Sequence, residues 1–246
     1  MASAFPPEAL AWLVGEQPST VLCVGTSPQV ATLAWSGHSV TIADTDPKVL
    51  THLATTIPNA HVVAARPESL PFDPCVFNSV LSIQNFHTLP TGLALSEWAR
   101  VLVPGGHIAV SLLTRDDSVP WVRRLRTTVQ RWLPEAMKGD YGVESTKALT
   151  ASPYFHDIET TKYRLWVPST REYLQNSART APGADELSNQ DREMMVAEVG
   201  KLYDTYARVP DPLQLPYQLS CWKAYVDQAE LTQALLRGDV GLTISL

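Results

Sequence analysis

The chain has 246 residues, 45% of them hydrophobic, which is enough to bury one substantial core and favours a single domain with a local cap. Its net charge is −6 and its Lys and Arg residues are scattered, so the composition argues against a nucleic-acid partner. No apolar run approaches the ~20 residues of a membrane span, so we expect no membrane partner either.

The first part of the chain alternates short apolar strands with helices. Residues 21–24 are expected to form a buried strand, and residues 28–37 a helix that ends at a glycine. Residues 40–43 form the next strand. Asp46 then stands before a proline as the N-cap of a helix over 47–57.

Three more strands continue this alternation. Residues 61–65 and 76–83 are apolar runs of strand length, and residues 94–102 place their apolar side chains on one helix face. Pro-Gly-Gly at 104–106 is expected to end that helix with a turn that requires positive φ, before a buried strand over 108–112. Five strands alternating with helices predict an α/β fold with a doubly wound parallel sheet.

The second half of the chain is less regular. Residues 121–133 carry an apolar helical stripe, which we interpret as a surface helix that covers the sheet, and residues 134–153 are polar and loop-like. Ser188 begins a capping-box pattern ahead of a helix that runs to Tyr206.

Two late strands bring the expected sheet to seven. Residues 155–166 and 213–221 show partial alternation, and a hairpin of the two would complete a mostly parallel sheet. Pro216 restricts the second of them to an edge or a bulge. We therefore expect one domain with a core over 1–116, a cap and the sixth strand over 117–212, and the last strand and a tail over 213–246.

Cysteine usage and the first residues give two further expectations. Cys23, Cys75 and Cys221 form no Cys-x-x-Cys pair or His cluster, so we expect no disulfide framework and no metal site, and each should be a buried small apolar residue. The start of the sequence lacks a basic segment followed by an apolar run, which favours the cytoplasm.

Four motifs follow one another in the first half of the chain: the acid Asp44 at the end of the second strand, Glu68-Ser-Leu-Pro-Phe72, Phe86-His-Thr-Leu89 and Arg100-Val-Leu-Val-Pro-Gly-Gly106. In this order they resemble class I S-adenosylmethionine-dependent methyltransferases of the small-molecule bacterial type. The resemblance covers about half of the chain and extends weakly into 168–174 and 215–222. It implies a Rossmann-like methyltransferase fold with a helical cap, S-adenosylmethionine as cofactor, and methyl transfer to a small molecule.

The loop after the first strand departs from the family pattern. The family places an acid in the first strand and a Gly-x-Gly-x-Gly turn after it, whereas this chain has Cys23 in place of the acid and Gly25, Ser27 and Gln29 in place of the three glycines. Either Ser27 caps the next helix and the loop still admits the ligand carboxylate, or the pocket has closed and the fold remains as a scaffold. The resemblance assigns to this part of the cofactor site Val24, Gly25, Thr26 and Ser27.

Asp44, with Thr45 beside it, is the strongest candidate for a cofactor contact. A carboxylate at the end of the second strand can accept both hydroxyls of a ribose, which is the role of the matching family residue. The alternative is an exposed loop acid, or a second helix cap that competes with Asp46. Arg66 stands where the family has an acid for the adenine amino group, and its guanidinium either stacks on the ring or is a solvated loop charge. Its neighbours Pro67 and Glu68 complete this part of the site.

Gln84 and Asn85 follow the fourth strand, at the crevice where open α/β sheets bind ligands. Gln84 would line the cofactor and the acceptor, or else bond its own backbone as a loop amide. His87 is the histidine that the sequence places at this crevice. It is either a proton acceptor for an acceptor hydroxyl, amine or acid, or a histidine packed at a helix start.

The function implied by the resemblance is methyl transfer from S-adenosylmethionine to a small molecule in the cytoplasm. The alternative is an inactive binding or regulatory protein with the same fold. A nicotinamide oxidoreductase is less well supported because Gly-x-Gly-x-x-Gly is absent, and hydrolase chemistry lacks a Gly-x-Ser-x-Gly elbow. The sequence leaves the acceptor and the oligomeric state open.

Overall fold

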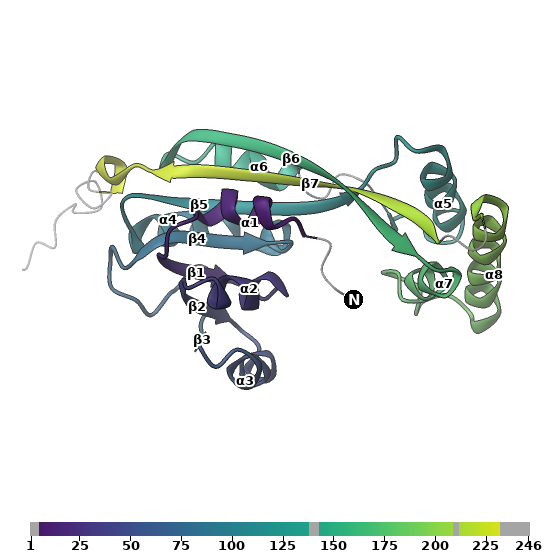
Figure 1. Cartoon of the computed structure of the whole chain (residues 1–246), viewed down its shortest axis with the longest axis horizontal. Coiled ribbons are helices and arrows are strands. Elements are labelled where there is room, and N and C mark those ends of the chain that lie inside the picture. The colour runs from purple at the N-terminus through teal and green to yellow at the C-terminus, as the bar shows by residue number, and fades with distance from the viewer. Residues whose placement is uncertain (1–4, 138–142, 209–211, 232–246) are drawn as a thin grey trace, which may run out of the picture. The chain divides into compact units, whose positions relative to one another are not determined.

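The computed structural model describes residues 5–137, 143–208 and 212–231. Within these ranges one seven-stranded sheet has the strand order β3-β2-β1-β4-β5-β7-β6, labelled in Figure 1. The predicted seven-stranded α/β sheet is therefore confirmed. Its strands are β1 Thr20–Val24, β2 Ser39–Asp44, β3 Ala60–Ala64, β4 Phe77–Ile83, β5 Leu102–Arg115, β6 Phe155–Ser169 and β7 Leu213–Val226.

Helices begin where side chains can cap them. Asp46 caps α3 as predicted, because its Oδ1 accepts a hydrogen bond from the Lys48 amide (2.8 Å) ahead of the first turn. Ser188 caps α8 in the same way through the Asp191 amide (3.1 Å). The described helices are α1 Pro7–Val14, α2 Gln29–Trp35, α3 Pro47–Thr56, the short 3-10 helix η1 Phe86–Thr88, α4 Thr91–Val101, α5 Pro120–Gln130, α6 Val143–Thr150, α7 Arg171–Arg179 and α8 Asn189–Tyr206.

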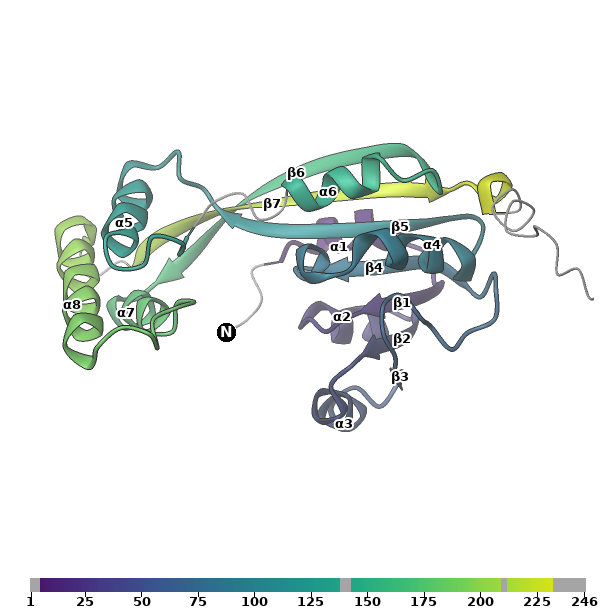
Figure 2. The same cartoon turned by 180° about the vertical axis from the view of Figure 1, so that it is seen from behind.

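The first five strands of the sheet are parallel. β1 pairs with β2 and β4, β2 with β3, and β4 with β5, all in the parallel sense. Helices α1 and α4 lie on opposite faces of this sheet, as the two views in Figures 1 and 2 show. A sheet covered on both faces buries every side chain of its central strands, which explains why β1 reads as an unbroken apolar run.

β5 begins earlier than the sequence predicts. The run 104–106 was expected to be a turn between helix and strand, but β5 already starts at Leu102 and contains this run. The run is accommodated by a register shift against β4, where Phe77 pairs with Leu102 and Ser79 with His107. The middle residue of the run has a φ of +75°, which confirms the positive φ expected for it.

Contacts within the chain define two compact units. As far as its residues are described, unit 1 consists of Met1–Leu112, Gly142–Lys162 and Ser220–Leu246, and unit 2 of Leu113–Tyr141 and Tyr163–Leu219. Unit 2 corresponds to most of the expected cap. The segment Gly142–Lys162 was expected in that cap but belongs to unit 1.

The core of unit 1 lies between the sheet and α4. Trp98 on α4 is fully buried, its ring centroid is 6.0 Å from that of Phe86, and its Nε1 donates a hydrogen bond to the Pro67 carbonyl (3.0 Å). The other apolar residues of the predicted α4 face, Ala94 and Val101, are buried as well. This helix therefore anchors the loop after β3 as well as the sheet.

Unit 2 has an apolar core of its own. The stripe predicted on α5 is buried, including Leu125 and Val129, but α5 packs against α8 instead of covering the sheet. Met195 and Val199 of α8 and Leu174 of α7 belong to the same cluster. Because the sequence analysis did not predict α7, it had no helical partner for this stripe other than the sheet.

Two predictions about chain segments are wrong. The polar segment 134–153 was expected to be a loop, yet it contains α6, which buries Leu149 and contacts α4. Pro216 was expected on an edge strand or at a bulge, yet β7 lies between β5 and β6. Pro216 is tolerated because its carbonyl accepts the Asp116 amide (3.0 Å), a bond that needs no proline N–H.

The cysteines divide into two kinds. Cys23 and Cys221 are buried as predicted, whereas Cys75 is exposed and has a φ of +59°. The prediction for Cys75 is wrong because this residue lies in the turn before β4 and not in the strand itself. None of the helices in the described ranges is long and apolar enough to cross a membrane.

Candidate functional site

The residues expected to bind a cofactor gather at the carboxyl ends of the parallel strands. Val24 at the end of β1 pairs with Ala43, and Asp44 at the end of β2 pairs with Ala64 at the end of β3. β4 lies on the other side of β1 and ends at Ile83. Topology thus brings four loops to one edge of the sheet, the usual ligand-binding position in open α/β folds.

Gly25 makes the sharp turn after β1. Its φ is +78°, and its amide donates a hydrogen bond to the Ala43 carbonyl (2.8 Å). A Cβ built on Gly25 would lie 1.8 Å from Nδ2 of Asn85. The turn therefore needs glycine for two reasons, its backbone angle and the side chain packed over it.

Asn85 bridges β4 and the first loop. Its Nδ2 donates to the Val24 carbonyl (2.8 Å), and its Oδ1 accepts a hydrogen bond from the Ser82 hydroxyl (2.5 Å). Sequence reasoning placed Asn85 in the cofactor site, but did not find that its amide covers Gly25. The two residues are far apart in the sequence, and nothing in the sequence pattern signals this contact.

Ser27 does not cap the next helix, so that part of the prediction is wrong. The N-cap of α2 is Pro28, with no side-chain cap, because Pro28 adopts a helical φ and ψ that moves the helix start past Ser27. The Ser27 hydroxyl is buried and has no hydrogen-bond partner among the described residues. Thr26 lies beside it in the same loop. The space that these residues enclose with β1 and β4 is about 160 Å³ and too narrow for a water molecule.

Asp44 and Asp46 divide the roles that the sequence left open. Asp46 caps α3, whereas Asp44 uses one oxygen, Oδ1, to accept the Asp46 amide (2.9 Å). The second carboxylate oxygen of Asp44 has no partner among the described residues, and the side chain is half-buried. Thr45 between them is exposed. Asp44 is therefore not a helix cap, and it keeps an oxygen for a ligand.

Cys23 occupies the position at which the family carries an acid. The side chain is buried, and burial raises the pKa of its thiol to about 12. Cys23 is therefore neutral at physiological pH. It cannot supply the negative charge that would hold an ammonium group.

The loop after β3 is held by α4. Arg66 is exposed, Pro67 offers its carbonyl to Trp98, and Glu68 is half-buried. Arg100 donates to the carbonyls of Leu70 (3.1 Å) and Phe72 (2.8 Å).

Glu97 completes this support from the same helix. It accepts the Leu70 amide (2.8 Å) and binds Arg100 through both carboxylate oxygens (2.7 and 2.8 Å). The hydrogen bonds from Arg100 hold the pKa of the Glu97 carboxyl below its ordinary value. Sequence reasoning missed Glu97, although an acid three residues before an arginine on one helix is a detectable signal.

Gln84 and His87 flank Asn85. Gln84 has a φ of +66°, and its amide donates to the Ser111 carbonyl of β5 (2.8 Å). His87 lies on η1 and is exposed, whereas its neighbour Phe86 is fully buried. The alternative of a packed histidine is therefore wrong, because Phe86 fills the buried position at this helix start.

A groove between α2 and α3 adjoins the first loop. Its volume is about 610 Å³, and Thr26 and Ser27 contribute to its wall together with Trp35 and His52. Asp44, Arg66 and Gln84 do not line it. The structure therefore brings the expected site residues to one edge of the sheet without enclosing them in one cavity.

Comparisons with known proteins agree with this arrangement. Residues 22–110 match the family model of the methyltransferase domain. An uncharacterised methyltransferase of Mycobacterium tuberculosis (strain H37Rv) is 32% identical over 130 residues, which cover 52% of this chain and 54% of that protein. The chain thus spans about half the length of these mycobacterial relatives. An uncharacterised methyltransferase of Schizosaccharomyces pombe is 24% identical over 223 residues, 87% of each chain.

Solved structures share the fold at low sequence identity. A candidate type II methyltransferase from Anaeromyxobacter dehalogenans superimposes with a TM-score of 0.66 at 16% identity, covering 90% of this chain and 96% of that one. A candidate methyltransferase from Bacillus halodurans gives a TM-score of 0.55 at 14% identity, covering 89% and 97%. Identities this low show a common fold and leave the ligand to the residues of the site.

Proposed function

We propose that this chain, whose residues 22–110 belong to the class I S-adenosylmethionine-dependent methyltransferases, binds S-adenosylmethionine and transfers its methyl group to a small-molecule acceptor. The observation that carries the proposal is Asp44. It stands at the end of β2 with one carboxylate oxygen fixed by the Asp46 amide and the other available. A carboxylate in this position can accept hydrogen bonds from a ribose diol.

The residues of the edge fit the proposed cofactor in chemistry more fully than in space. Ser27 offers a buried hydroxyl that has no partner among the described residues, suited to the carboxylate of the methionine end. The Asn85 amide, however, fills the space over Gly25. Binding therefore requires the Asn85 side chain to move, or the methionine end to pass the loop on its Ser27 side.

S-adenosylmethionine, when bound, supplies a methyl group on a positively charged sulfur that a nucleophile can displace. The chain's own residues have the task of binding and aligning. Asp44 would fix the ribose, and Arg66, exposed on the loop that α4 holds, would stack on the adenine. Alignment of the acceptor with the methyl group supplies most of the rate for an acceptor that is already nucleophilic.

His87 is proposed to accept the proton of an acceptor hydroxyl, amine or acid. Its imidazole is exposed on η1, directly after the end of β4. A neutral imidazole is the side chain suited to this step near neutral pH. We propose a cytoplasmic location for the reaction on the basis of the N-terminal sequence.

Calorimetric titration with S-adenosylmethionine and S-adenosylhomocysteine tests the proposal. We expect dissociation constants in the micromolar to low millimolar range, ~4 to 8 kcal/mol of binding free energy. Asp44→Asn keeps an oxygen for the Asp46 amide but removes the charge, so it should weaken binding at least tenfold, ~1.4 kcal/mol, with little loss of stability.

Asp46→Ala is the matched control, because it removes the same charge two residues away. It should cost about 1 kcal/mol of stability through loss of the α3 cap and leave ligand affinity unchanged. Absence of binding of both ligands at millimolar concentration to the folded protein would contradict the proposal. The fold would then serve as a scaffold without a cofactor.

A further inference from the structure

Unit 2 contains a pocket of its own, away from the strand ends discussed above in the sequence. It is a cavity of about 190 Å³, with room for roughly six water molecules at their liquid volume. Leu125 and Val129 of α5, Leu174 and Ala178 of α7, and Pro182 supply most of its wall. The wall is thus largely apolar.

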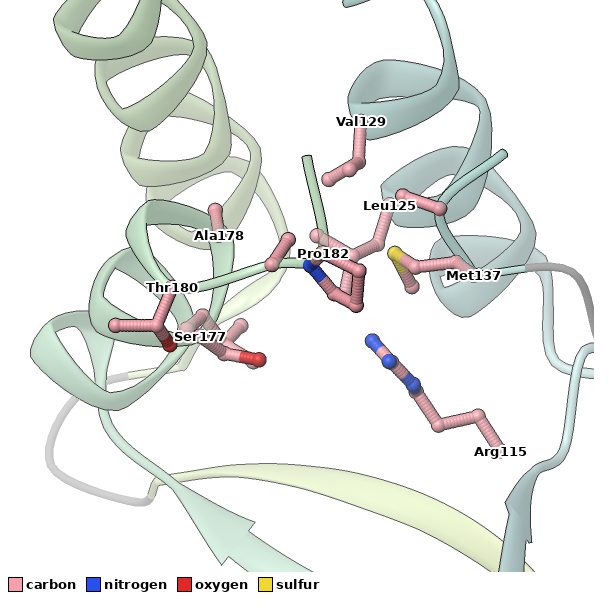
Figure 3. Close-up of a pocket in the computed structure, with 11 residues that line it drawn as sticks. Arg115, Leu125, Val129, Met137, Ser177, Ala178, Thr180 and Pro182 are labelled. Atoms are coloured by element: carbon pink, nitrogen blue, oxygen red, sulfur yellow. The ribbon is translucent and has the colours of Figure 1, made fainter. Parts of the chain in front are cut away.

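Arg115 at the end of β5 contributes a cation to this apolar pocket. Figure 3 shows its guanidinium extended toward Met137 and Pro182. Arg115 has no hydrogen bond or ion pair with any of the described residues. The other arginines with carboxylate partners in this unit show the contrast, namely Arg126 with Asp117, Arg131 with Glu198, Arg164 with Asp116, Arg171 with Asp204 and Arg179 with Glu193.

A guanidinium in an apolar pocket selects the charge of a ligand. It binds a carboxylate through two parallel hydrogen bonds, and it does so more strongly where water is partly excluded. A ligand with several charges would bury the others against Leu and Val side chains without partners, at a large cost. The rest of the ligand must therefore be apolar.

We propose that the pocket around Arg115 binds a compact monocarboxylic acid, with the carboxylate on the guanidinium and a short aliphatic or aromatic body against α5 and α7. The volume limits the body to the size of hexanoate or benzoate. The Ser177 hydroxyl lines the same pocket and offers a second donor to the carboxylate. This site lies in unit 2 and does not depend on the proposed cofactor site in unit 1.

Titration of the purified full chain with hexanoate and benzoate tests this proposal, with 1-hexanol and inorganic phosphate as comparison probes. We expect both acids to bind and to raise the melting temperature. The alcohol lacks the charge and phosphate lacks the apolar body, so each should bind at least tenfold more weakly. Equal affinity for hexanoate and 1-hexanol, or tighter binding of phosphate, would overturn the proposal.

Two variants separate the cation from the apolar wall. Arg115→Gln should weaken hexanoate binding at least tenfold, whereas Arg124→Gln, which removes an exposed charge from α5, should leave it unchanged. Ala178→Leu keeps Arg115 but fills the cavity, and it should weaken benzoate binding by a similar factor.

The remaining outcomes are equally decisive. Wild-type affinity in Arg115→Gln, or equal losses in Arg115→Gln and Arg124→Gln, would overturn the proposal. Circular dichroism of each variant confirms folding before titration. The Asp44→Asn variant should still bind hexanoate, and so distinguishes this site from the proposed cofactor site.

Discussion

At the residue scale, the first loop contains a polar atom that the folded protein leaves without a partner. The Ser27 hydroxyl is buried without a hydrogen bond to a described residue, and Pro28 takes the capping position that the sequence assigned to Ser27. A buried hydroxyl in this state costs ~1 to 3 kcal/mol of folding free energy. Such a cost is understandable if a ligand supplies the missing bond.

Ser27→Ala is therefore expected to raise or preserve stability while it weakens S-adenosylmethionine binding at least threefold. Thermal unfolding and calorimetric titration measure the two effects. Ser36→Ala is the control, since its hydroxyl is bonded to the Thr32 carbonyl at the other end of α2 (2.8 Å). Unchanged affinity in Ser27→Ala would show that this hydroxyl does not contact the ligand.

At the element scale, α4 determines the shape of the loop after β3. Glu97 and Arg100 between them bond one amide and two carbonyls of this loop, and Trp98 bonds a third carbonyl. Each bond joins residues about thirty positions apart. The helix therefore holds Arg66 and Glu68 at the edge of the sheet, although it lies outside the site.

Glu97→Gln should destabilise the protein by about 1 to 3 kcal/mol at neutral pH, because it removes the charge that pairs with Arg100. The pH dependence has a defined sign. The pKa of Glu97 is lower in the folded protein, so its contribution is fully present above the ordinary glutamate pKa and is lost as the pH falls through the lowered value.

Unfolding by urea at pH 7 and at pH 3 measures this prediction. The difference in stability between wild type and Glu97→Gln should be largest at pH 7 and shrink at acid pH. Glu193→Gln is the control, because Glu193 pairs with Arg179 on the surface of unit 2. An equal loss at both pH values would contradict the role given to the Glu97 charge.

At the scale of the whole molecule, two apolar cores lie in two compact units. Met195 is fully buried in the core of unit 2, and Leu81 is buried in β4 of unit 1. Met195→Ala and Leu81→Ala should each cost ~2 to 5 kcal/mol by leaving a cavity. Because the clusters are separate, each cost should be concentrated in its own unit.

Hydrogen exchange of the two variants measures that separation. Met195→Ala should accelerate exchange in α5, α7 and α8, and Leu81→Ala in β1, β2 and β4. Identical acceleration over the whole chain in both variants would show instead that the two units open as one cooperative structure.

The sequence by itself determined the elements and the family. Apolar runs of strand length gave five parallel strands in order, and Asp46 and Ser188 marked helix starts that the structure confirms. These features depend on residues that are close in the sequence, where spacing, capping and backbone preference act directly. The order of Asp44 and the later motifs was likewise readable without coordinates.

The tertiary structure alone decided which groups remain available for chemistry. It placed the Asn85 amide over Gly25, left one Asp44 oxygen and the Ser27 hydroxyl without described partners, and left Arg115 unpaired in an apolar pocket. It also exposed His87 by burying Phe86. Whether a polar group finds a partner depends on side chains brought together from distant segments, and local sequence patterns do not encode that packing.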